Sequence, residues 1–346
     1  MDISVWVVSA HSTIIPHVPS VTVIHSGTTA NLERVPLLSA SGRCASSALS
    51  ALALVTFLTA CGSTEGSSDP GTAAQAEVTI PFSAARVEVL DAGREPREVL
   101  RMDAATGTGQ STTLTTSSQV TQQIDQQPAQ DFSSPETTIP LEAEVSSAVS
   151  SESPNTVIDM TLSGMSTPDT TMQAALDGAD GSRAGLSVTA AGAVTALRLR
   201  PSTAAPNPAR AAIEQAFGQA VYRTVALPDS AVGIGARWVI RQDVTSEIAL
   251  DQITTVTLTA KENTRLTLTV EVNQTPKNPV WELAGDAGTL NIDQYVMTGT
   301  GTVTIDTGLP LPVAGAMTVG GDQSYSDPGG QSVIRQTIAN SIRWSE

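Results

Sequence analysis

The sequence predicts a mainly β fold: an antiparallel curved sheet or an incomplete barrel over residues 78–346. Three observations lead to this prediction. Apolar residues alternate with polar ones over many short runs, which is the period of a strand with one face in the core and one in water. Those runs are rich in Thr and in β-branched residues, which favour strands. Only residues 208–223 have the apolar spacing of an amphipathic helix.

The strands are predicted from this alternation. Residues 256–260 and 265–273 alternate most clearly, and the polar turn 261–264 between them predicts a hairpin. The run 333–344 fits a helix or a strand, and we favour a strand because its even-numbered apolar positions extend to Trp344. Further strands are expected around residues 98–102, 112–124, 139–145, 158–162, 186–199, 237–243, 290–297 and 302–306.

The single predicted helix has a clear beginning and a clear apolar face. Asn207 is a suitable N-cap, and Pro208 suits the first turn. Ile213, Phe217 and Val221 repeat every four residues and so share one face. Two of these and four strand residues are expected to point inward, where they either line a ligand site or fill the core: Ile213, Phe217, Leu266, Leu268, Val270 and Val272.

A short internal match raises the possibility of a duplication. Residues 99–103 resemble residues 239–243, and each copy precedes Ser/Thr-rich alternating runs. Either the match is chance, or halves at 85–200 and 233–346 pair into one broad sheet. The long polar connection 164–184 is expected either to cover an opening of that sheet or to be mobile.

Composition excludes several classes of function. The net charge of −16 argues against a nucleic-acid binder, because such a chain repels phosphates. All three His and both Cys lie within the first 61 residues. The remaining chain therefore has no residue for a Ser-His-Asp triad, a cysteine nucleophile or a His/Cys zinc site. We expect no enzyme, no cofactor and no metal.

For the remaining candidate catalytic and binding residues, a structural role is the better interpretation. Paired carboxylates could hydrolyse glycosides, but no pair stands out, and a solvated strand face is the better interpretation of Glu142, Glu144, Asp159 and Glu271. Lys261 and Lys277 are expected to be exposed, with ordinary pKa values. The loop 177–181 resembles a calcium loop only faintly and is expected to be a polar turn. The later tryptophans are expected to pack in the core or at its rim: Trp238, Trp281 and Trp344.

An apolar run near the N-terminus has the layout of an export signal. Residues 44–60 are uncharged, follow Arg43, and lead into Leu58-Thr59-Ala60-Cys61. This motif resembles the lipobox of bacterial lipoproteins. The resemblance implies that Cys61 is acylated and anchors the chain to the extracytoplasmic side of the cell membrane.

The segments on either side of the apolar run complete this organisation. Residues 61–77 begin with the lipidated Cys and continue as a Gly/Ser/Thr/Pro-rich flexible tether to the β-domain at 78–346. Residues 1–43 are too long for the basic part of a signal. They are either a misassigned start, with translation beginning later, or a disordered extension.

The order of these features resembles a known family. A lipobox, Thr-rich strands, a Pro-led helix and then Gly233-Ile234-Gly235-Ala236-Arg237-Trp238 resemble an uncharacterised family of actinobacterial all-β lipoproteins, over about residues 85–346. That family has no activity to transfer. More distantly, the expected architecture is similar to the lipid- and lipoprotein-carrier lipoproteins of bacterial envelopes.

These interpretations lead to three functional hypotheses. The first is a non-catalytic cell-envelope lipoprotein, held at the membrane through Cys61, that binds an apolar or amphiphilic ligand such as a lipid. The second is a structural or protein-interaction lipoprotein with a filled β core and protein partners that the sequence does not identify. The third is a hydrolase that uses acidic residues.

Overall fold

The computed structural model describes residues 77–150, 153–283 and 287–346. The predicted N-terminal extension, the apolar run 44–60 and the lipobox at 58–61 lie outside these residues. Neither helix of the described part combines the length and the apolar character needed to cross a membrane.

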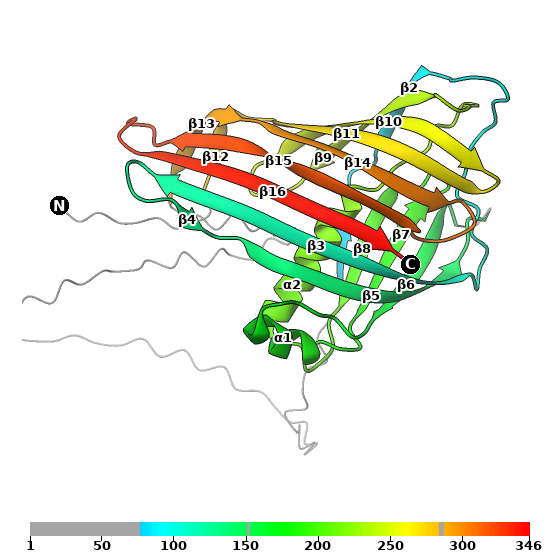
Figure 1. The fold of residues 1–346 in the computed structure, drawn as a ribbon, viewed down its shortest axis with the longest axis horizontal. Coiled ribbons are helices and arrows are strands. Elements are labelled where there is room, and N and C mark those ends of the chain that lie inside the picture. Colours follow the sequence, from blue (N-terminus) through cyan, green and yellow to red (C-terminus); the bar gives the residue numbers. More distant parts are fainter. Residues whose placement is uncertain (1–76, 151–152, 284–286) are drawn as a thin grey trace, which may run out of the picture. The chain divides into compact units, whose positions relative to one another are not determined.

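The described strands form one antiparallel sheet of sixteen strands, which confirms the predicted fold class (Figure 1). Its main path runs β1-β8-β7-β6-β5-β3-β16-β15-β14-β11-β10-β9-β2, and its two end strands do not pair, so the sheet is not a closed barrel. In chain order the strands are β1 (Val78–Pro81), β2 (Arg86–Asp91), β3 (Gly109–Ile124), β4 (Gln130–Asp131), β5 (Ser134–Ser147), β6 (Asn155–Leu162), β7 (Arg183–Thr189), β8 (Val194–Arg200), β9 (Arg237–Val244), β10 (Leu250–Glu262), β11 (Arg265–Pro276), β12 (Val280–Glu282), β13 (Thr289–Tyr295), β14 (Met297–Asp306), β15 (Ala314–Ser326) and β16 (Val333–Ser345).

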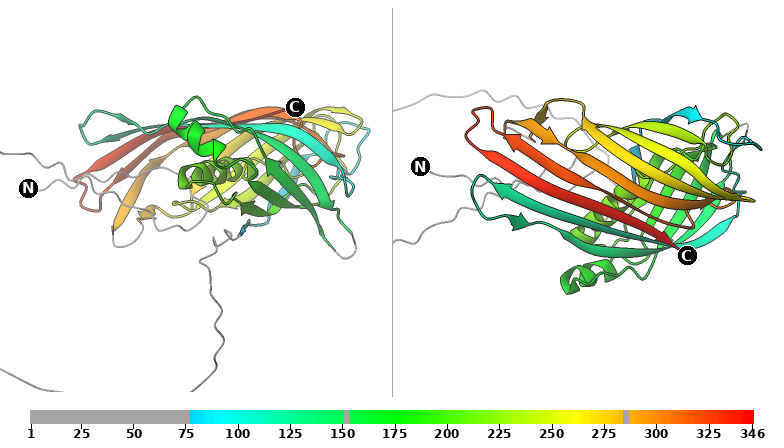
Figure 2. Two further views of the ribbon diagram at one scale, coloured as in Figure 1. Left: turned by 90° about the horizontal axis from the view of Figure 1, so that it is seen from below. Right: turned by 45° about the horizontal axis from the view of Figure 1, so that its top comes forward.

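The course of the chain explains where the main helix lies. Strands β3 to β8 run from the middle of the sheet toward one edge, and β9 to β16 return from the other edge to the middle. There β16 pairs with β3 along almost its whole length, from Ile334 opposite Ile124 to Ser345 opposite Thr113. Helix α2 (Asn207–Val221) connects β8 to β9 and therefore crosses the concave side of the sheet from one edge region to the other (Figure 2).

The two edge strands are close neighbours in the sequence. Strand β1 ends at Pro81 and β2 begins at Arg86, so residues 82–85 alone connect opposite ends of the strand order. Five Cα–Cα steps span at most about 18 Å when fully extended. The sheet must therefore curl until its edges nearly meet, as expected for an incomplete barrel. Phe82 is buried in this connection, and its backbone N–H donates to the carbonyl oxygen of Thr195 on β8.

The predicted core is confirmed. The six residues expected to point inward, on β11 and α2, are all buried in the main hydrophobic cluster, together with Val221. Trp238, Trp281 and Trp344 are buried as well.

The hairpin of β10 and β11 turns at residues 263–264, where Asn263 adopts a positive φ of 55°. The run 333–344 is a strand, as favoured.

Other local predictions were wrong. Residues 98–102 form no strand; Glu98 makes only an isolated bridge with Val232, and β2 occupies the edge beside β9 instead. Residues 99–103 are therefore not a strand, whereas residues 239–243 lie in β9, so the two copies of the proposed repeat differ in structure. The sheet contains β15, which was not predicted, and residues 186–199 form parts of two strands, β7 and β8, rather than one.

The expectation of a single helix was also wrong. Helix α1 (Thr170–Asp177) lies within the connection 164–184, and Figure 1 shows it below α2. Its N-cap is Asp169, whose Oδ1 accepts a hydrogen bond from the backbone N–H of Met172 at 2.8 Å. At eight residues it is too short to display a repeated apolar face.

The two glycines before Trp238 serve backbone packing. A Cβ on Gly233 would lie 1.9 Å from the carbonyl oxygen of Arg94, so only glycine allows this close approach. Gly235 has a φ of +87°, in the left-handed region that favours glycine. The segment leads directly into β9 rather than into a helix, so it does not form a phosphate-binding loop.

Candidate functional site

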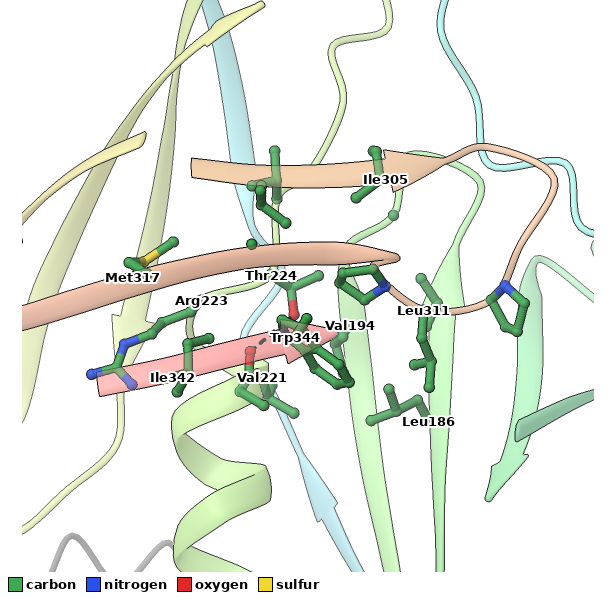
Figure 3. A pocket seen from close by; sticks show the side chains of 18 of the residues that line it. Leu186, Val194, Val221, Arg223, Thr224, Ile305, Leu311, Met317, Ile342 and Trp344 are labelled. Atoms are coloured by element: carbon green, nitrogen blue, oxygen red, sulfur yellow. Dashed lines mark hydrogen bonds between the residues drawn. The ribbon is translucent and has the colours of Figure 1, made fainter. Parts of the chain in front are cut away.

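An apolar cavity of about 70 Å³ lies between the C-terminal end of α2 and the concave face of the sheet (Figure 3). The figure shows Val221 and Trp344 near one another, with Leu186 and Val194 on the strands beside them. A cavity needs roughly 10–15 Å³ to hold one water molecule, so this space exceeds a single water site. Its lining is almost entirely apolar: Met102, Met160, Leu186, Val188, Gly192, Val194, Phe217, Ala220, Val221, Arg223, Thr224, Val225, Thr302, Val303, Ile305, Pro310, Leu311, Pro312, Gly315, Ala316, Met317, Ile342 and Trp344.

A second pocket, of about 150 Å³, adjoins the same end of α2 and is lined mostly by amides and aromatic residues. The amide side chains come from α2 and from strands β10, β11, β15 and β16: Gln215, Gln219, Gln252, Gln274, Gln323, Gln336 and Asn340. Trp281, Tyr295 and Tyr325 supply aromatic rings, and Tyr222, Arg223 and Glu247 supply further polar groups. This polar pocket offers more hydrogen-bonding groups than the apolar cavity.

The polarity of the concave face changes along single strands. On β16 the even-numbered side chains point inward; Gln336 and Asn340 belong to this set, followed by Ile342 and Trp344. The same face of β15 carries Met317 at the apolar end, whereas Gln323 lies at the polar end. A signal for the site was therefore present in the sequence: glutamines at the inward positions of otherwise apolar strand faces.

Hydrogen bonds fix the buried glutamines. Gln252 donates from Nε2 to the carbonyl oxygen of Tyr222 at 2.7 Å, and Gln274 donates to Gln252 Oε1 at 2.9 Å. Beside them, Gln336 donates to Gln122 Oε1 at 2.7 Å. Buried polar groups with such partners are held in one orientation. The pocket wall is therefore preorganised.

The tyrosines of the polar pocket are neutral hydrogen-bonding groups. Burial raises the pKa of Tyr295 and of Tyr325 above its ordinary value. The Tyr325 hydroxyl donates to Gln323 Oε1. Desolvation by burial also raises the pKa of Tyr222, although the Thr245 backbone N–H donates to its hydroxyl oxygen at 3.0 Å and opposes that shift.

Within the described part of the chain, Arg223 alone lines both cavities. It follows α2 directly, and Figure 3 shows its side chain extending away from Val221, with the guanidinium group at the far end. Nη1 donates to Gln219 Oε1 and Nη2 to the carbonyl oxygen of Asn340, each at 3.2 Å. Burial lowers the pKa of Arg223 to about 10, so the group remains cationic at neutral pH.

Glu247 lines the polar pocket from the loop between β9 and β10. The residue is exposed at the surface. Even so, desolvation by the surrounding protein raises the pKa of its carboxyl group to about 7. Of the ion pairs in the described chain, none joins Glu247 to Arg223.

Most of the residues that the sequence predicted to line a ligand site do not line the apolar cavity. Of the six residues expected to point inward, only Phe217 lines the apolar cavity, and the others pack in the core around it. The cavity wall is shared by many elements: α2 and the segment after it, β7, β8, β14, β15, β16 and the loop before β15 all contribute. No single run of the sequence therefore signals the cavity.

The acidic candidates lie away from both cavities. Glu142, Glu144 and Asp159 line a groove formed with arginines of β7 and β8, whereas Glu271 on β11 does not. Partial burial raises the pKa of Asp159, but hydrogen bonds from Ser146 and Arg198 outweigh it, and the pKa is lowered overall. Asp159 is therefore ionised at neutral pH and unsuited to act as a general acid.

The remaining chemical candidates form ordinary polar contacts. Lys261 pairs with Glu98, and Lys277 pairs with Asp243, each at 2.7 Å. The hydrogen bond with Asp243 raises the pKa of Lys277, contrary to the ordinary value expected, so Lys277 does not serve as a base at neutral pH. In the loop 177–181, carboxylate oxygens accept hydrogen bonds from Gln173 and from the Gly164 backbone. Among the described residues no acidic cluster has the arrangement of a metal site.

Comparisons with protein-family models, curated proteins and solved structures find no match for this chain. The concave face itself is therefore the basis for a functional proposal. The arrangement there is an apolar cavity and a polar pocket that meet at one cationic side chain.

Proposed function

We propose that the concave face binds an amphiphilic molecule, with its alkyl part in the apolar cavity and its polar head in the polar pocket. The observation that carries this proposal is the adjacency of a strongly apolar cavity and a pocket richer in polar groups at the end of α2, with Arg223 in the wall of both. An apolar ligand alone would leave the amides of the polar pocket without a ligand partner. A polar ligand alone would gain nothing from the apolar cavity.

The energetics favour such a ligand. Each CH₂ group moved from water into an apolar site contributes about 0.8 kcal/mol. A polar head is costly to bury without hydrogen bonds, and the glutamines and tyrosines supply donors and acceptors for it. At about 70 Å³ the apolar cavity holds only a few carbons of an alkyl chain, so the rest of a longer chain would extend out of it. We therefore propose a single-chain ligand rather than one with several long chains.

We also propose that the chain is an extracytoplasmic lipoprotein anchored through Cys61, in keeping with its resemblance to actinobacterial all-β lipoproteins. The support is the motif Leu58-Thr59-Ala60-Cys61 after an apolar run. Mass spectrometry of the peptide that carries Cys61, isolated from the native host, tests this anchor. A diacylglyceryl mass on Cys61 is expected, and an unmodified thiol would refute the anchor without affecting the binding proposal.

Two tryptophans serve as reporters for the binding test. Trp344 lines the apolar cavity, and Trp281 lines the polar pocket. The full chain is titrated with 1-dodecanol, and fluorescence is followed in the parent and in Trp344→Phe and Trp281→Phe. Binding is expected to change the emission of Trp344 most strongly, because that indole lies beside the alkyl chain.

Native mass spectrometry of full-length chain, purified without delipidation, gives an independent result. A reproducible adduct that organic solvent removes supports ligand binding. A clean ligand-free mass together with no fluorescence change would refute it. That outcome would favour the alternative in which the face is only a filled core and the protein acts through protein partners.

A further inference from the structure

We infer that the head group of this amphiphile is an anion, a carboxylate or a phosphate, and that the Arg223 guanidinium group binds it. This inference rests on the proposed binding function and adds the chemical class of the ligand. The observation that carries it is the position of Arg223: this cation, which has no carboxylate partner in the described chain, lies at the border between an apolar cavity and a polar pocket.

Among the residues that the structure describes, Arg223 has no acidic partner within ion-pair distance. In the described chain, the arginines that form ion pairs with carboxylates at 4.0 Å or less are Arg97, Arg101, Arg198, Arg265 and Arg343. Arg223 instead donates to two neutral acceptors, Gln219 Oε1 and the carbonyl oxygen of Asn340. The Arg223 side chain is only partly exposed, and its two neutral acceptors do not compensate its charge.

The bonding of the guanidinium group leaves room for a ligand. A guanidinium group has five N–H donors, and only two of them have protein acceptors here. The two acceptors come from α2 and from β16, so they hold the planar group in place across the end of the helix. Planar, fixed guanidinium groups match the two oxygens of a carboxylate or a phosphate.

The electrostatics point in the same direction. Enclosing a charge without a counter-charge is costly, and an incoming anion would compensate for that cost. Glu247 also lines the polar pocket, but the residue is exposed and lies beyond ion-pair distance of Arg223. The glutamines around the guanidinium group are neutral and do not repel an anion.

The position of Arg223 distinguishes an anionic amphiphile from a free anion. The stem of its side chain borders the apolar cavity, so an anion on the guanidinium group places an attached alkyl chain beside Val221 and Trp344 (Figure 3). Inorganic phosphate would gain only the polar contacts. We therefore expect both parts of the ligand to contribute to affinity.

The test uses ligands of equal chain length on the full chain. Dodecyl phosphate and dodecanoate are compared with 1-dodecanol and dodecyltrimethylammonium, and inorganic phosphate is measured alone. The parent protein is expected to bind the two anions about tenfold or more tightly than the alcohol, as charge-assisted hydrogen bonds are stronger than neutral ones. The cationic ligand is expected to bind most weakly.

Three variants test whether Arg223 is responsible for the preference for anions. Arg223→Gln is expected to bring the affinities for anion and alcohol to within about threefold of each other, whereas Arg223→Lys keeps part of the preference. Arg210→Gln is the matched control; Arg210 lies at the other end of α2, and its Nε donates to the Ala205 carbonyl oxygen. This control is expected to keep the full preference.

Each failure has a distinct meaning. Equal binding of dodecyl phosphate, the alcohol and the cation by the parent protein overturns the anionic head, even if Arg223→Gln proves unstable. A preference that persists in a folded Arg223→Gln overturns the assignment to Arg223. Inorganic phosphate that binds as tightly as dodecyl phosphate overturns the amphiphile. If no dodecyl ligand binds at all, the proposed function itself fails.

Discussion

The ring of Phe82 meets the ring of Tyr222 edge to face, with centroids 5.2 Å apart and an interplanar angle of 71°. This contact joins the connection between the two sheet edges to the C-terminal end of α2. Tyr222 immediately precedes Arg223, so the same contact helps to fix the residue that borders both cavities. Packing between these two rings therefore links the edge region of the sheet to the candidate site.

We expect Phe82→Ala to lower the free energy of unfolding by about 3–5 kcal/mol, because it removes a buried aromatic ring. Tyr222→Phe keeps the ring and loses only the hydroxyl oxygen that accepts from the Thr245 N–H. Thr245 is exposed, so water can replace that contact, and the expected loss is about 1 kcal/mol or less. Urea unfolding followed by tryptophan fluorescence measures both. Equal losses in the two variants would contradict this account of the ring contact.

The glycines before β9 form a matched pair. Gly233→Ala places a methyl group 1.9 Å from the Arg94 carbonyl oxygen, whereas a Cβ on Gly235 meets no atom within 4 Å. Gly235→Ala therefore suffers only from its positive φ, at a cost of about 1–2 kcal/mol. We expect Gly233→Ala to be clearly less stable than Gly235→Ala in thermal unfolding. The reverse order would show that Gly233 does not approach Arg94 as described.

Trp238 provides a test of a buried hydrogen bond. Its side chain is fully buried, and Nε1 donates to the Ala226 carbonyl oxygen at 2.9 Å. Trp238→Phe leaves that buried oxygen without its donor and is expected to lower the free energy of unfolding by about 1–3 kcal/mol, beyond the loss of ring volume. Chemical denaturation measures the change. A change below about 0.5 kcal/mol would mean that Ala226 finds another donor.

The carboxyl group of Glu247 predicts a pH dependence of stability. Its folded-state pKa of about 7 exceeds the ordinary value of 4.5, so between these pH values the folded chain binds more protons than the unfolded chain. The contribution of Glu247 to the free energy of unfolding therefore falls as the pH rises from 4.5 to 7. Glu247→Gln removes this contribution.

We expect Glu247→Gln to gain stability relative to the parent when the pH is raised from 4 to 8. The effect is small because the residue is exposed. Melting temperatures measured across this range test the sign. A difference between variant and parent that does not vary with pH would exclude the raised pKa.

Filling the apolar cavity should weaken ligand binding without unfolding the chain. Ala220 is buried on α2 and lines the cavity, so Ala220→Leu places additional methyl groups in that space. Ala211→Leu, on the exposed side of the same helix, is the control. Titration with dodecyl phosphate is expected to show at least about fivefold weaker binding for the first variant only, as each CH₂ displaced from the site costs about 0.8 kcal/mol. Equal affinities would place the alkyl chain elsewhere.

Sequence patterns predicted the strands whose two faces differ most. The inward residues of β11 are apolar from Leu266 to Val272, and the alternation extends along most of β16. Strand β15 escaped prediction because Gly320 and Gly321 interrupt its alternation. In the sheet, a Cβ on Gly320 would lie 2.4 Å from the Ile338 carbonyl oxygen, so the glycine serves close strand packing that no local pattern reveals.

The site was less predictable than the sheet. Arg223 lies in the polar pocket because α2 must carry the chain between opposite edge regions, which is a property of the topology and not of residues 208–223. Likewise, residues 98–102 have strand-like alternation, but β2 occupies the edge position beside β9. Competition for that position is decided by the whole sheet.

The edge strands of the sheet also affect whether two copies of this protein can pair strand to strand. Strand β1 has only four residues and ends in Pro81, and β2 has six, with Arg86 and Asp91 at its ends and an irregular register between Val89 and Asp91. Short, charged or proline-containing edges offer few free backbone groups to a strand of another molecule. A sheet of this width would otherwise be a template for aggregation. Lengthening either edge strand with alternating Val and Thr would remove that protection and promote fibrous assembly.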